Sequence, residues 1–354
     1  MAKRGNDECV LVTRFSALGD VAMTLPVVYG ACAANPGTHF VMLTRKLPAR
    51  LFVSPPENLS VVGIDTALYK GPAGMARLLN EMRGNFGVTT MVDLHDVLRT
   101  KIMRLFARLR GMKVAKVDKG RREKKSLTRH SDKAVIQLKP MPQRYKEAFS
   151  RAGIDISKPA PLFPSGKGDP ALFAKVSAPK QEGEFWLAVA PFAAHAGKIY
   201  PLPLLAKVID HYAEQPHCRV FIFGAGDKER NRIAELAKDR ANVVSMAENP
   251  IGIEGELALM SHCDTMLAMD SANMHMASLV GLRTVSIWGA THPYAGFYGT
   301  GQNPADAVQL DMVCRPCSVF GNKPCARGDY HCLSGISPQL VISRINNTPE
   351  SLKA

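Results

Sequence analysis

No stretch of this 354-residue sequence stays apolar for long. None approaches the roughly 18 apolar residues that a membrane-spanning helix needs, and the first ten residues, MAKRGNDECV, have charges in place of the apolar core of a signal peptide. A disulfide framework is not expected from eight cysteines in an intracellular chain of this length. These absences exclude membrane-spanning and small disulfide-rich secreted proteins, and they predict a cytoplasmic location.

Aromatic residues are also scarce, at 7%, and this matters most in residues 99–151. That segment holds 18 Lys or Arg and 4 Asp or Glu, which accounts for the whole net charge of +14. Such a charge predicts an acidic partner: a nucleic acid, an anionic membrane or a phosphorylated substrate. Its only aromatics, Phe106, Tyr145 and Phe149, are too few for stacking on single-stranded nucleic acid, so no nucleic-acid partner is expected. Residues 119–129 are predicted to be a mobile loop because they are too charged to pack.

Apolar runs typical of strands alternate with helical segments along both halves of the chain. Strands are expected at 9–14, 39–44, 59–64, 88–93 and 113–117, and again at 185–190, 219–223, 242–246, 265–269 and 284–288. Helices are expected at 21–34, 97–110, 139–153, 203–215, 228–239 and 254–261. This alternation predicts α/β domains with parallel sheets.

Pro, Gly and Ser are dense in residues 154–180, which indicates an interdomain connection. We therefore expect two Rossmann-like, doubly wound domains that face each other across a cleft. They comprise residues 1–165 and 185–336, with a linker at 166–184 and a C-terminal helix at 337–354 that Ser337 caps.

The stretch 264–299 carries the strongest local signal for a ligand site. A buried strand runs into the polar turn 270–273, a short helix ends at Gly281, and a second buried strand runs into Gly289. Ligands of parallel sheets bind beyond the carboxyl ends of the strands. The free N–H groups at the helix start suit an anion such as a phosphate.

Four landmarks along the chain resemble a known family. They are SALGDVAMTLP (16–26), AGKIYP (196–201), FGAGDKE (223–229) and DSANMHMASLVG with WGATHP (270–293). Together they resemble the ADP-heptose:lipopolysaccharide heptosyltransferases, which are inverting sugar transferases with the GT-B fold. The resemblance implies that the N-terminal domain binds the lipopolysaccharide-core acceptor and the C-terminal domain the nucleotide sugar, with no cofactor required.

Asp20 matches the family's general base. An inverting transfer needs one carboxylate to take the proton of the attacking hydroxyl. The alternative is that Asp20 only caps the helix expected to start at Val21, since Asp is a preferred N-cap residue. Ser16 and Gly19, in the same loop, are expected to contact the acceptor.

The resemblance assigns the donor site to three segments of the second half. Lys198 matches a lysine that contacts the donor diphosphate, where a cation stabilises the leaving group without a metal. The remaining donor candidates are Gly224, Gly226, Glu229, Asp270, Ser271, Ala272, Asn273 and His275. Ala272 stands where a glycine is common, and Ala adopts positive φ less readily. Other roles stay open: an exposed lysine for Lys198 and a core histidine for His275.

The basic segment matches the acceptor side of the family. Its candidate residues are Asp93, His95, Arg99, Lys101, Arg104, Arg121 and Arg122. Arg grips carboxylates and phosphates with two donors at once, so acidic core sugars and lipid phosphates are the expected ligands. The alternative is a solvated basic face. An anionic inner-membrane surface is expected to attract the same charges, which predicts peripheral attachment at its cytoplasmic face.

Four cysteines, Cys314, Cys317, Cys325 and Cys332, have the spacing C-x2-C-x7-C-x6-C. Four thiolates can bind zinc tetrahedrally, but the second pair is spaced too widely for a common zinc ribbon. A structural zinc, reversible disulfides and free thiols all remain open.

The sequence thus predicts a heptosyltransferase that uses ADP-heptose and an acidic inner-core acceptor. Two alternatives remain: a related transferase with another nucleotide sugar, and a non-catalytic nucleotide- or nucleic-acid-binding protein.

Overall fold

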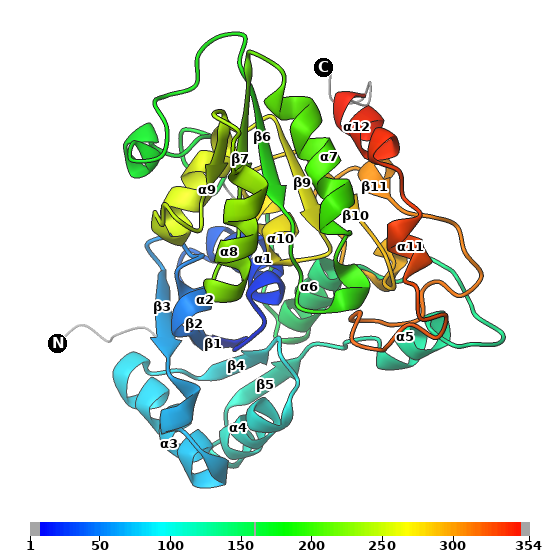
Figure 1. Cartoon of the computed structure of the whole chain (residues 1–354). Helices are drawn as coiled ribbons and strands as arrows, with labels where there is room; N and C mark the ends of the chain where they lie inside the picture. Colours follow the sequence, from blue (N-terminus) through cyan, green and yellow to red (C-terminus); the bar gives the residue numbers. More distant parts are fainter. Residues whose placement is uncertain (1–7, 159–160, 348–354) are drawn as a thin grey trace. The chain divides into compact units, whose positions relative to one another are not determined.

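A computed structural model describes residues 8–158 and 161–347 (Figure 1). The described chain forms two compact units. The first contains the described residues within 1–119 and 139–164, and the second those within 120–138 and 165–354. The N-terminal decapeptide, up to residue 7, and the end of the predicted C-terminal helix, from residue 348, lie outside the described residues.

The first unit is a five-stranded parallel sheet in the order β3-β2-β1-β4-β5. Its strands are β1 (Cys9–Thr13), β2 (His39–Arg45), β3 (Leu59–Ile64), β4 (Thr90–Asp93) and β5 (Lys113–Lys116). Its helices are α1 (Leu18–Ala34), α2 (Lys46–Ala49), α3 (Gly71–Phe86), α4 (Leu98–Leu109) and α6 (Met141–Arg151), with the 3-10 turn η1 (Thr66–Leu68). Alternate residues of β1, Cys9 and Leu11, join the core under α3 and α4.

The second unit is a six-stranded parallel sheet in the order β11-β10-β9-β6-β7-β8. Its strands are β6 (Phe185–Ala190), β7 (Cys218–Ile222), β8 (Val243–Ser245), β9 (Thr265–Met269), β10 (Thr284–Ile287) and β11 (Ala307–Val308). Its α-helices are α5 (Arg121–Leu127), α7 (Leu202–Ala213), α8 (Asp227–Ala237), α9 (Gly252–His262), α10 (Ala272–Leu279), α11 (His331–Ser334) and α12 (Pro338–Asn346). Short 3-10 turns are η2 (Pro170–Phe173), η3 (Ala196–Lys198), η4 (Pro293–Ala295) and η5 (Pro304–Asp306).

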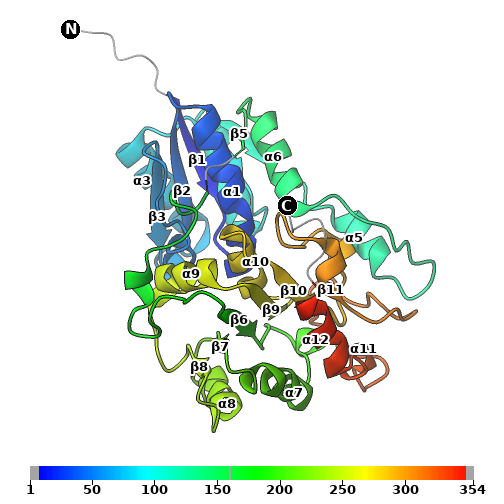
Figure 2. The same ribbon diagram turned by 90° about the horizontal axis from the view of Figure 1, so that it is seen from above.

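Helices cover both faces of this second sheet (Figure 2). Residues of α7, α8 and α12 share one core cluster with β6, β7, β9 and β10, whereas α9 and α10 lie on the other face. The prediction of two doubly wound, parallel-sheet α/β units is confirmed.

The basic segment 120–138 is the main departure from the sequence-based prediction. Its start was expected to be a loop, but residues Arg121–Leu127 form α5 and pack on the second unit. The Lys124 ammonium lies 4.0 Å from the Phe297 ring centroid, and Leu127 packs with Leu138 and Ala295. The loop prediction was wrong because long basic side chains can bury their stems and hold a cation over an aromatic ring.

Helix boundaries differ from the predicted ones where polar residues were taken as loop. α1 begins at Leu18 and not at Val21, and α10 begins at Ala272. Ser337 caps α12 as expected, since its Oγ accepts a hydrogen bond from the Leu340 amide at 3.2 Å.

Within the described residues, no helix is both long and apolar enough to cross a membrane.

Candidate functional site

Asp20 occupies the first turn of α1, directly after the loop that leaves β1. Its Oδ2 accepts a hydrogen bond from the amide of Ala17, the N-cap residue, at 3.2 Å. Asp20 is the third residue of the helix and accepts from the N-cap amide, as in a capping box. The alternative that Asp20 is itself the N-cap was therefore wrong, because Ala17 takes that position. The side chain is 26% exposed, which leaves the carboxylate reachable by a ligand.

Arg14 holds the same carboxylate, and the sequence analysis missed it. Its Nη2 lies 2.6 Å from Asp20 Oδ2, and its side chain is only 4% exposed. The guanidinium also donates to the Ser16 carbonyl at 2.9 Å through Nε and to the Leu94 carbonyl at 2.7 Å through Nη1. A buried Arg whose planar fork serves three acceptors is a rigid support. The only signal in the sequence was a basic residue that ends an apolar strand.

Asp93, His95 and Arg104 form a buried network at the carboxyl end of β4. Asp93 is fully buried, and its Oδ1 accepts from the amides of His95 and Asp96 at 2.8 and 3.0 Å. Arg104 reaches Asp93 Oδ2 at 3.2 Å and Asp96 Oδ1 at 3.0 Å. These carboxylates and this guanidinium are thus engaged with each other, which favours a supporting role over direct acceptor contact.

His95 is neutral at physiological pH. Burial is the largest cause, and the nearby Arg14 and Lys119 add to it, so that the pKa of His95 is lowered to about 3. Its Nδ1 accepts from the Phe15 amide at 3.3 Å. His95 therefore offers no positive charge to an acidic acceptor.

The other predicted acceptor residues are divided between the two units. Ser16 is partly exposed in the loop before α1, and Gly19 is buried in the first turn of α1. Arg99 and Lys101 are exposed on α4 of the first unit, whereas Arg121 and Arg122 are exposed on α5 of the second.

In the second unit, three loops at the carboxyl ends of β6, β9 and β10 bring Lys198, Asp270 and Thr291 together. Lys198 Nζ lies 3.1 Å from Asp270 Oδ2, and the Thr291 hydroxyl donates to the same oxygen at 2.8 Å. The side chains of Lys198 and Asp270 are 14% and 10% exposed. The sequence predicted Lys198 and Asp270, but it gave no signal for the bond from Thr291.

Close backbone contacts fix these loops. The Ala290 amide donates to the Gly197 carbonyl at 2.8 Å. A Cβ at Gly289 would lie 2.6 Å from that carbonyl oxygen and 2.5 Å from Leu333 Cγ, so only glycine fits there. Lys198 therefore lies on a tightly packed loop at the carboxyl ends of the strands.

The first turn of α10 adds backbone donors beside this cluster. Ser271 is the N-cap with extended φ and ψ of −140° and 178°, and its buried Oγ has no hydrogen-bond partner among the residues described. Ala272 is the first helical residue and does not take positive φ, so the missing glycine costs nothing. Asn273 is partly exposed, whereas His275 is buried within the helix. The N–H groups of such a turn bind anions.

Gly224 and Gly226 lie in the loop between β7 and α8, and Glu229 lies in the first turn of α8. Glu229 Oε2 accepts from the Ala225 amide at 2.9 Å, and Gly226, with φ of 86°, is the N-cap of α8. A Cβ at Gly224 would lie 2.5 Å from Ile233 Cδ1 and 2.9 Å from Glu229 Oε2. The positive φ of Gly226 favours glycine, whereas a Cβ at Gly224 would press on the side chains of Ile233 and Glu229. Glu229 braces the loop through its bond to Ala225.

The four clustered cysteines are free thiols in the structure. Burial raises the pKa of the Cys332 thiol to about 11. Among the described residues, no group of three or more His, Cys, Asp or Glu could hold a metal ion. Whether these four cysteines bind zinc stays a prediction, which metal analysis of the purified protein tests.

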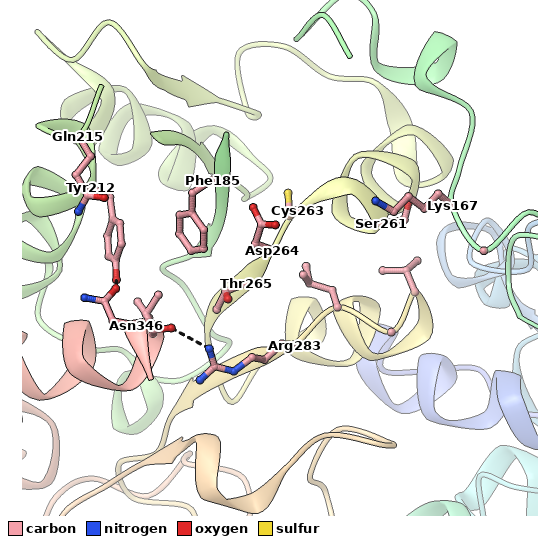
Figure 3. Close-up of a pocket in the computed structure, with 15 residues that line it drawn as sticks. Lys167, Phe185, Tyr212, Gln215, Ser261, Cys263, Asp264, Thr265, Arg283 and Asn346 are labelled. Carbon is pink, nitrogen blue, oxygen red and sulfur yellow. Dashed lines mark hydrogen bonds between the residues drawn. The ribbon is translucent and has the colours of Figure 1, made fainter. Parts of the chain in front are cut away.

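A cavity of about 950 Å³ opens in the second unit, at the amino ends of the strands (Figure 3). It is lined by Phe185 and Thr265, the first residues of β6 and β9, and by Arg283 just before β10. Arg283 is already bound to the Asp306 carboxylate at 2.7 Å and to the Ile345 carbonyl at 2.8 Å. This cavity lies at the amino ends of the strands, whereas Lys198 and Asp270 lie at the carboxyl ends.

Known proteins share sequence and fold with this chain. The chain is 24% identical over 336 residues to lipooligosaccharide heptosyltransferase 2 of Campylobacter jejuni, and the match covers 93% of this chain and 95% of that protein. A solved glycosyltransferase family 9 protein from Veillonella parvula shares the fold with a TM-score of 0.71, at 15% identity and 98% coverage of both chains. The solved ADP-heptose LPS heptosyltransferase II of E. coli gives a TM-score of 0.67, at 15% identity and 95% and 97% coverage.

The family model described as glycosyltransferase family 9 (heptosyltransferase) matches residues 85–324. Because this match spans more than half of the sequence, the chain belongs to glycosyltransferase family 9, the heptosyltransferase family, and is a glycosyltransferase.

Proposed function

We propose that the enzyme transfers a heptose from ADP-heptose to the acidic inner core of lipopolysaccharide or lipooligosaccharide, with inversion at the anomeric carbon. The observation that carries this proposal is the Asp20 carboxylate, which is partly exposed and held by the buried Arg14. The sequence relatives and the solved E. coli enzyme support this donor and acceptor class.

In the proposed reaction, an acceptor hydroxyl oxygen attacks the anomeric carbon and its proton passes to Asp20. The bond from that carbon to the diphosphate oxygen breaks, and ADP leaves with the electron pair. The Arg14 guanidinium stabilises the ionised carboxylate, which is the form that a general base requires. General-base catalysis of this kind contributes about 10²- to 10⁴-fold to a rate.

The second unit supplies the charge stabilisation for the leaving diphosphate. Lys198, oriented by Asp270 at 3.1 Å, contributes a cation, and the first turn of α10 contributes backbone N–H groups. Gly224, Gly226 and Glu229 are proposed to contact the nucleotide ribose. Six residues are proposed for the acidic acceptor: Ser16 before α1, Gly19 in its first turn, Arg99, Lys101, Arg121 and Arg122.

The test is transfer by the Asp20→Asn variant. We expect it to fold and to bind ADP, because the nucleotide candidates lie in the other unit, but to lose transfer by at least about 100-fold. Thermal shift with ADP-heptose measures donor binding separately, since a ligand at 100 times its Kd adds about 2.7 kcal/mol to stability. Near wild-type turnover of Asp20→Asn would refute the assignment.

A further inference from the structure

Helix α4 carries an apolar ridge on its solvent side. Leu98, Leu105 and Leu109 are 74%, 56% and 72% exposed. Their spacings of seven and four residues place them on one stripe of a helix. The opposite side of α4 is the one that packs on the first unit, where Met103 and Ala107 are buried in the core.

Basic side chains flank this ridge. By helical periodicity, Lys101 and Arg108 lie along one side of it, and Arg99 and Arg110 along the other. No Asp or Glu occurs from residue 98 to residue 110. Arg104, the remaining base of the helix, points inward to Asp93 and Asp96, so it does not belong to this surface.

A stripe of large exposed leucines needs a partner that removes it from water, since an isolated soluble surface rarely keeps such a stripe. Because Lys and Arg flank the leucines and no Asp or Glu lies on the helix, the partner should be anionic. A nucleic acid would bind the Lys and Arg side chains but leave the leucines exposed to water. An anionic bilayer satisfies both demands, because acyl chains cover the apolar ridge while headgroup phosphates meet Lys and Arg.

We infer that the solvent side of α4, the α4 ridge of Leu98, Leu105 and Leu109 with its flanking bases, docks the enzyme on an anionic phospholipid bilayer. The helix lies in the plane of the headgroups and does not span the bilayer. The purpose of the docking rests on the proposed function, because a lipid-linked acceptor is met at a membrane surface. The binding itself requires neither donor nor acceptor.

The test is co-sedimentation of the full chain with vesicles of phosphatidylglycerol and phosphatidylethanolamine, compared with vesicles of phosphatidylcholine alone. We expect binding to the anionic vesicles that weakens with added salt. The L98Q/L105Q/L109Q variant should lower the partition coefficient at least about tenfold. K101Q/R108Q should lower it by about tenfold at low salt and flatten the salt dependence.

Matched controls separate this ridge from exposed leucines in general. Leu68, Leu172 and Leu340 are 65%, 39% and 36% exposed elsewhere on the molecule, and L68Q/L172Q/L340Q should bind vesicles like wild type. The melting temperature shows that each variant is folded. Asp20→Asn should also bind like wild type, so that failure of the proposed chemistry and failure of docking are told apart.

Three results would overturn the inference: no binding of wild type, equal binding to neutral vesicles, or equal losses in the two leucine variants. A fourth is a dimer in size-exclusion chromatography that only L98Q/L105Q/L109Q dissociates, with no vesicle binding, which would make the ridge a contact between two copies of this chain.

Discussion

Replacing Arg14 by Lys tests whether the buried guanidinium supports Asp20, the carboxylate that we propose as the general base. The substitution keeps the positive charge but replaces a planar fork by a single ammonium. The fork now serves three oxygens: the Ser16 and Leu94 carbonyls at 2.9 and 2.7 Å and Asp20 Oδ2 at 2.6 Å. Lysine cannot reach all three from one point.

The magnitude follows from the hydrogen bonds that a lysine side chain cannot make. Hydrogen bonds to a charged group contribute about 1.5–3 kcal/mol each, and a buried acceptor left unpaired costs a similar amount. If one or two of the three acceptors are left without a donor, we expect the free energy of unfolding to fall by about 2–4 kcal/mol. Asp20 then keeps the Ala17 amide but loses the guanidinium that orients it. This should lower kcat by about tenfold to 100-fold, because general-base catalysis depends on geometry.

Denaturant unfolding and steady-state transfer measure these two effects. The Michaelis constant for the nucleotide sugar should change little, because its candidate residues lie in the other unit. Arg45→Lys is the control, since Arg45 is an exposed arginine at the end of β2 and should change neither stability nor kcat. If Arg14→Lys keeps wild-type stability and kcat, the support that we assign to Arg14 is refuted.

Further predictions concern the second unit. Lys198→Met should lower kcat about 100- to 1,000-fold in a transfer assay, as loss of a charge-stabilising donor does; less than about a fivefold change would exclude it from the leaving-group site. Gly289→Ala should lower the melting temperature, because its Cβ would lie 2.5 Å from Leu333 Cγ; an unchanged value would contradict the tight packing. Burial raises the pKa of Glu256 from 4.5 to about 7, so the folded state binds this proton more tightly, and the free energy of unfolding should fall as pH rises from about 4.5 through 7. Glu256→Gln should remove that slope, stabilising the protein at pH 8 by about 3 kcal/mol, whereas Glu254→Gln, at an exposed position, should keep it. Parallel pH profiles of wild type and Glu256→Gln would count against this reasoning.

Most of the sheet could be predicted because buried parallel strands are short apolar runs. The strand at 59–64 has the predicted ends, as does the one at 265–269. α3 was not predicted, although its buried residues, Met75, Leu78, Leu79 and Met82, repeat with a helical period. Helix starts failed at Leu18 and Ala272, because polar first-turn residues are shared by loops and helices.

The site could be predicted only as far as local motifs reach. Asp20, Lys198 and Asp270 follow directly from strand ends and loops. The partners of these residues come from other segments: Arg14 from the preceding strand end and Thr291 from the loop after the next strand. Long-range placement also explains why α5 was not predicted, since the cation–π contact of Lys124 with Phe297 joins segments that are far apart in the sequence.

The central claim is that this chain moves a heptose with Asp20 as the base. Its most direct test is mass spectrometry of a heptose-free inner-core acceptor after incubation with ADP-heptose and either wild type or Asp20→Asn. We predict that the acceptor gains the mass of one heptose with wild type and none with the variant. Absence of that product with wild type, or the same yield from both proteins, would contradict the account.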